Sequence, residues 1–79
     1  MAWYVQVSKE AHGKLAVHGK LERFQKRSDA EWFAQYQIHG WRVGQPRISA
    51  ELFSGSNRNA LTLRARVWKD TEGIQRITY

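Results

Sequence analysis

The chain has 79 residues, which is enough for one domain and too few for two. It contains no cysteine, so disulfide bonds and thiolate metal sites are excluded and the fold must depend on packing. Thirteen lysines and arginines against seven acidic residues give a formal net charge of +6, which favours nucleic acid or an acidic protein surface as a partner. We therefore expect a single small basic domain over residues 1–79.

The chain enters a strand pattern within its first residues. It shows neither a secretory signal nor an apolar run near the roughly 20 residues that span a bilayer. We therefore expect a soluble, cytoplasmic protein without a membrane partner. No pattern of residues indicates a cofactor.

Two strands are predicted at the start of the chain. Trp3, Val5 and Val7 alternate with polar residues, which indicates a strand with one apolar face. A turn is expected over residues 9–13. Leu15, Val17 and Leu21 then occupy alternate positions on both sides of Gly19. This spacing predicts a second strand that runs to about residue 24 and is bulged at Gly19.

A helix is predicted over about residues 29–39. Ser28 and Glu31 have the spacing of a capping box, in which each side chain bonds the backbone N–H of the other. Gly40 suits a left-handed residue that ends the helix. The wheel positions expected in the core are Ala30, Phe33, Ala34 and Ile38.

Two aromatic residues of this helix, Trp32 and Tyr36, flank its apolar face. Anchoring in the core is favoured over an exposed patch for a partner. After the helix, Pro46 interrupts the segment 41–53, which predicts either an edge strand or a strand broken near residues 44–46. The polar loop Ser54–Asn59 is a candidate for closing over a ligand.

The last twenty residues predict a hairpin. Residues 61–68 alternate with period two, and the side expected to face the core is Leu61, Leu63, Ala65 and Val67. A turn follows, with Gly73 free to adopt a positive φ, and residues 74–79 return as a strand. With Asp70 opposite Ile74, Trp68 pairs with Arg76.

The predicted order is thus β-β-α-β-β-β. It indicates an α+β fold with a mainly antiparallel sheet and one amphipathic helix packed on one face.

The register of the hairpin gathers a basic surface with an aromatic residue in it, formed by Arg64, Arg66, Arg76 and Trp68. Lys69 and Arg58, in or near the adjacent turns, extend it. Guanidinium groups match phosphate geometry, and an indole can stack on an unpaired base. The leading hypothesis is therefore a non-enzymatic nucleic-acid-binding domain, for DNA or RNA.

The same surface fits an alternative hypothesis, a small protein-interaction module. This would be an inhibitor or adaptor of phage or plasmid type whose basic face docks on an acidic partner. The cations could also serve only to keep the protein soluble and to protect an edge strand from aggregation. Charge alone does not separate these interpretations.

A second basic cluster consists of Lys20, Arg23, Lys26 and Arg27, just before the helix. Because Asp29 and Glu31 already occupy the start of the helix, a solvated connector is favoured there over an anion site.

The only residues suited to acid–base chemistry near neutrality are His12, His18 and His39. Their spacing builds neither a catalytic pair nor a metal site, so we expect no enzyme and no metal; a small ribonuclease is a distant third hypothesis. The edge formed by residues 74–79 could pair with a second copy in a homodimer.

Overall fold

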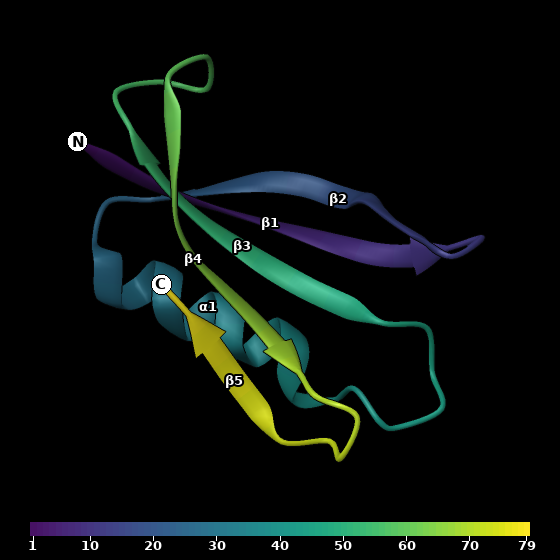
Figure 1. Ribbon diagram of the computed structural model, residues 1–79. Coiled ribbons are helices and arrows are strands. Elements are labelled where there is room, and N and C mark those ends of the chain that lie inside the picture. Colours follow the sequence, from purple (N-terminus) through teal and green to yellow (C-terminus); the bar gives the residue numbers. More distant parts are fainter.

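The computed structural model describes residues 1–79 and contains a five-stranded antiparallel sheet with a helix across one face (Figure 1). The elements are β1 (Ala2–Ala11), β2 (Lys14–Phe24), α1 (Arg27–His39), β3 (Ile48–Gly55), β4 (Leu61–Lys69) and β5 (Gln75–Thr78). The strands lie in the order β2-β1-β3-β4-β5, so β2 and β5 are the edges. The predicted α+β fold and its element order are confirmed.

The first hairpin turns more tightly than predicted. β1 continues to Ala11, and the turn consists of His12 and Gly13, whose φ values of 53° and 80° are those of a type I′ turn. The predicted turn over residues 9–13 is therefore too long. The bulge predicted at Gly19 is confirmed, because this residue has φ 87° and lies where the β1–β2 register shifts.

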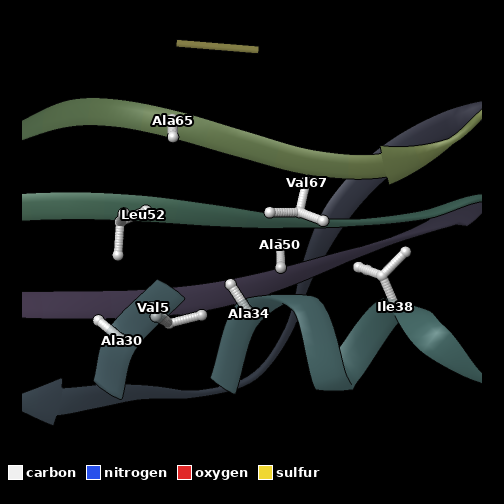
Figure 2. Packing of buried hydrophobic residues seen from close by; sticks show 8 residues of the cluster. All are labelled: Val5, Ala30, Ala34, Ile38, Ala50, Leu52, Ala65 and Val67. Atoms are coloured by element: carbon white, nitrogen blue, oxygen red, sulfur yellow. The ribbon is translucent and has the colours of Figure 1, made fainter. Parts of the chain in front are cut away.

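The core lies between α1 and the sheet (Figure 2). The helix presents Ala30, Ala34 and Ile38, at the i, i+4, i+8 spacing of one helical face, and all three are fully buried. Two of the three are alanines, whose small side chains let the helix backbone lie close to the strands. The sheet residues packed against them are Val5, Ala50, Leu52, Ala65 and Val67.

The helix ends at His39 as predicted, but its predicted start and the predicted geometry of both caps are wrong. The helix begins at Arg27, its N-cap Lys26 makes no side-chain capping bond, and Glu31 accepts a 2.8 Å bond from Nε of Arg27. The capping box does not form, because the Glu31 carboxylate pairs instead with Arg27, its oppositely charged neighbour at i−4. Gly40 has φ −82°, which is right-handed, and the turn closes through Trp41 N–H donating to the Ile38 carbonyl.

The segment before β3 is broken, as one of the two alternatives predicted. No strand is present over residues 41–47, and Nε1 of Trp41 donates to the Pro46 carbonyl at 2.8 Å, which closes the connection. The edge-strand alternative is wrong, because β3 lies in the middle of the sheet. The proline stays outside the ladder, where its missing N–H has no cost.

A bulge in β4 overturns part of the predicted hairpin pattern. Leu52 pairs with Ala65 whereas Phe53 pairs with Leu63, so Arg64 is an extra residue. One inserted residue reverses the alternation. Ala65 and Val67 face the core as predicted, but Leu61 and Leu63 face the other side, and Leu63 is 49% exposed.

The β4–β5 register agrees with the prediction. Trp68 pairs with Arg76 and Arg66 with Thr78, and Gly73 has φ 81° in the turn. No helix of this fold has the length and apolar character needed to cross a membrane.

Candidate functional site

The sheet face opposite α1 is not covered by any element, and it collects polar side chains from four strands. The register places Ser8, Ser49, Trp68 and Arg76 in one row across β1, β3, β4 and β5. The adjacent row consists of Gln6, Glu51, Arg66 and Thr78. We call this side the open face.

A hollow of about 730 Å³ lies on the open face, within the roughly 300–1,000 Å³ range typical of ligand sites. Its walls come from the tip of the β1–β2 hairpin, the start of β3, the length of β4 and the end of β5. Four of its lining residues are cationic and one is acidic: Arg47, Arg64, Arg66, Lys69 and Glu10. Trp68, Tyr79 and Leu15 add apolar surface.

Trp68 is held in place within this hollow. Its indole Nε1 donates to Oγ1 of Thr78 on the neighbouring strand at 3.1 Å. The ring is partly exposed, so part of its surface stays available. A fixed, partly exposed indole binds a flat ligand with little loss of side-chain entropy.

A buried carboxylate lies next to Arg66. Glu51 is only 8% exposed; its Oε1 accepts from Oγ of Ser49 at 3.0 Å and lies 3.8 Å from Nε of Arg66. Its Oε2 is buried and has no hydrogen-bond partner. The arginine therefore supplies the main charge compensation for this acid while leaving half of its own side chain exposed.

The two other predicted arginines of the hairpin are engaged with neighbouring side chains. Nε of Arg64 donates to Oγ of Ser54 at 2.7 Å, although Arg64 also lines the hollow. Arg76 lies opposite Trp68 as predicted, but its Nε donates to Oδ2 of Asp70 at 3.0 Å and it does not line the hollow. Arg76 therefore contributes less free charge than the sequence indicated.

Asp70 organises the β4–β5 turn. Its Oδ1 accepts from the backbone N–H groups of Ile74 and Glu72, both at 2.9 Å. These bonds, the Ile74 one foremost, together with Arg76 outweigh partial burial and lower the pKa of Asp70 below its ordinary value of 3.8.

Of the two predicted extensions of the basic surface, Lys69 lines the hollow but its ammonium group is engaged elsewhere, and Arg58 lies away from the hollow. Nζ of Lys69 donates to the carbonyls of His39 and Trp41 at 2.6 and 3.0 Å, so its ammonium group satisfies the end of α1. Arg58 lies in the β3–β4 turn, separated from Trp68 by about 20 Å of strand.

The second basic cluster is not brought to the hollow. Lys20 and Arg23 are exposed on β2, and Lys26 precedes the helix. The guanidinium of Arg27 lies 5.3 Å from the centre of the Trp3 ring and also pairs with Glu31. The connector interpretation remains a prediction for these residues.

The three histidines lie on different elements. His12 forms the tip of the first hairpin, His18 is on β2, and His39 is the last residue of α1. No group of three His, Asp or Glu side chains is arranged to hold a metal ion.

The structure adds site residues that the sequence did not single out: Arg47, Glu51, Tyr79 and Leu15. The sequence could have placed Glu51 on the open face, because it alternates with Ala50 and Leu52, which face the core. No sequence pattern could have placed Arg47 there, since only the path of the loop brings it to the hollow.

The prediction that Trp32 and Tyr36 anchor the core is wrong. They are 67% and 62% exposed, and their rings stack with centroids 5.2 Å apart and planes 11° from parallel. At about 100° per residue, these two side chains each lie roughly 160° around α1 from the buried Ala30, Ala34 and Ile38, so they point away from the sheet.

No family model, curated protein or solved structure matches this chain.

Proposed function

We propose that this protein is a nucleic-acid-binding domain that holds a single strand in the hollow of the open face. The observation that carries the proposal is the joint presence of Trp68 with Arg47 and Arg66 in one hollow of ligand size. An indole beside two guanidinium groups, of which that of Arg66 pairs with Glu51 but is half exposed, can serve both chemical parts of a nucleotide, the flat base and the phosphate.

Each residue has a distinct role in this proposal. Arg66 and Arg47 contact phosphates, whereas Trp68 stacks on a base. A base inside a duplex is already stacked on both sides, so an indole recessed in a hollow favours an unpaired base. Such contacts position the strand more than they select its sequence, so we expect weak sequence preference.

The test is a fluorescence anisotropy titration with labelled single-stranded and duplex DNA and RNA at about 50 mM and about 200 mM salt. We expect the single strands to bind more tightly, with an affinity that falls as salt rises. Replacing Arg47 or Arg66 singly by alanine should in each case weaken binding and reduce the salt slope by about 0.7. Arg58→Ala is the matched control, because it removes the same charge at the far turn.

Two outcomes would overturn the proposal. An Arg58→Ala loss as large as that of either hollow arginine would mean that net charge alone attracts the polyanion. Absent or millimolar binding of every nucleic acid would favour the alternative hypothesis, in which the basic surface docks on an acidic protein.

A further inference from the structure

The two edges of the sheet differ in how they are protected against pairing. The β2 edge carries Lys14, Lys20 and Arg23 and is distorted by the bulge at Gly19, which are common devices against strand addition. The β5 edge has one cation, Arg76, which Asp70 neutralises, and no bulge. Only β5 therefore offers a regular edge.

Backbone hydrogen-bonding groups on β5 point outward at alternate residues. Asp70 N–H donates to the Ile74 carbonyl, so this opposed pair is hydrogen-bonded. Hydrogen-bonded and non-hydrogen-bonded pairs alternate along an antiparallel ladder, so Arg76 bonds to β4 whereas Gln75 and Ile77 direct their N–H and C=O groups away from it.

Apolar surface lies beside this edge, on the helix side. Ile77 is 38% exposed although it pairs with the buried Val67, and it shares a narrow groove with Gln35 of α1. A neighbouring hollow of about 200 Å³ is lined by Gln75 together with the stacked Trp32 and Tyr36. A strand added to β5 would cover this surface.

We infer that the occupant is β5 of a second copy, paired antiparallel about a two-fold axis at Ile77. Ile77 then bonds Ile77 of the partner subunit through two N–H···O bonds, since both present outward groups. Arg76 lies opposite Thr78 of the partner subunit and diagonal to Arg76 of the partner subunit, and each Arg76 is neutralised by the Asp70 of its own chain. The register is self-complementary, so the same edge can serve both copies. The Asp70–Arg76 ion pair leaves this edge without a net charge that would attract an oppositely charged foreign strand, which favours a second copy.

The dimer requires the aromatic pair as well as the strand. A four-residue strand buries too little for a stable interface, which needs roughly 1,200–2,000 Å² in total. Trp32 and Tyr36, both more than half exposed, supply the additional apolar area in each copy. The two sheets join with both hollows on the same side, but the inference does not depend on what the hollows bind.

Single-cysteine variants test the register, because the natural chain has no cysteine. In Ile77→Cys, the two Cα atoms across the axis should be about 5.5 Å apart, which suits a disulfide. Gln75→Cys is the matched control: its two copies lie four strand positions apart along the paired edge. Mild oxidation should cross-link the first variant into a dimer and leave the control monomeric.

Sedimentation equilibrium of the unmodified protein completes the test. We expect a mass twice the 9.3 kDa of one chain, falling to one chain in Ile77→Lys and unchanged in Val17→Lys, which adds the same charge at the β2 edge. A monomer at all concentrations, or equal cross-linking of both cysteine variants, would overturn the inference. The cysteine variants decide it even if Ile77→Lys fails to fold.

Discussion

The two faces of the sheet use the same strands for different purposes. On the covered face, valine, leucine and alanine side chains meet two alanines and an isoleucine of α1, and every member of this cluster is buried. On the open face the middle of the sheet holds Ser8, Ser49 and Glu51, which are also buried, while Arg66 and Trp68 remain partly exposed.

This difference separates stability from binding. Apolar burial stabilises the fold roughly in proportion to the area removed from water, and the covered face supplies most of it. Buried polar groups contribute little net stability, but they hold neighbouring side chains in defined positions. Substitutions on the covered face should therefore change unfolding, and those on the open face should change affinity.

The largest expected effect is on the covered face. Leu52→Ala should lower the free energy of unfolding by about 2–5 kcal/mol, because Leu52 is fully buried against the helix. Leu63→Ala makes the same chemical change on the open face and should cost about 1 kcal/mol. Urea denaturation monitored by tryptophan fluorescence measures both, and equal costs would contradict the reversal of faces at the Arg64 bulge.

The next effect distinguishes two tryptophans on opposite sides of the molecule. Trp68→Ala should weaken single-strand binding by about 1–3 kcal/mol, the usual contribution of one stacked base. Trp32→Ala, on the exposed helix flank, should leave the affinity for a short oligonucleotide unchanged. Anisotropy titrations of both variants check this, and a similar loss in both would remove the special role of the hollow.

A smaller effect comes from the buried acid. Glu51→Gln keeps the shape of the side chain but removes the charge that holds Arg66, so the affinity for a polyanion should rise by roughly fivefold at most. Glu22→Gln removes the same charge on β2 and should change affinity less. If Glu51→Gln weakens binding, the acid positions Arg66 for the ligand instead of competing with it.

The smallest effect concerns pH and the hairpin that carries Trp68. The pKa of Asp70 is lowered in the folded state, so its contribution to stability is present above its unfolded value near 3.8 and is lost as pH falls through the lower folded value. Asp70→Asn should therefore flatten the acid limb of the stability profile. Urea midpoints between about pH 6 and about pH 2 measure this, and parallel profiles for parent and variant would refute it.

Much of the fold could be predicted from local pattern. The strand-strand-helix-strand-strand-strand order, the bulge at Gly19 and the pairing of Trp68 with Arg76 all depend on spacing along a single segment. The site could be predicted only in part, because the hollow joins Arg66 and Trp68 to residues of distant segments such as Leu15 and Arg47.

The sequence by itself determined which residues alternate, where the helix forms and that the protein is strongly basic, because these follow from side-chain chemistry at short range. Only the tertiary structure decided which cations stay free: Lys69 satisfies the end of α1, and Arg76 pairs with Asp70. It also decided that Trp32 is exposed, since it set which side of α1 packs on the sheet, and Trp32 lies on the opposite side. Which group pairs with each charged side chain, and how deeply each aromatic ring is buried, depend on how separate segments pack together. Local spacing along the sequence does not specify this packing.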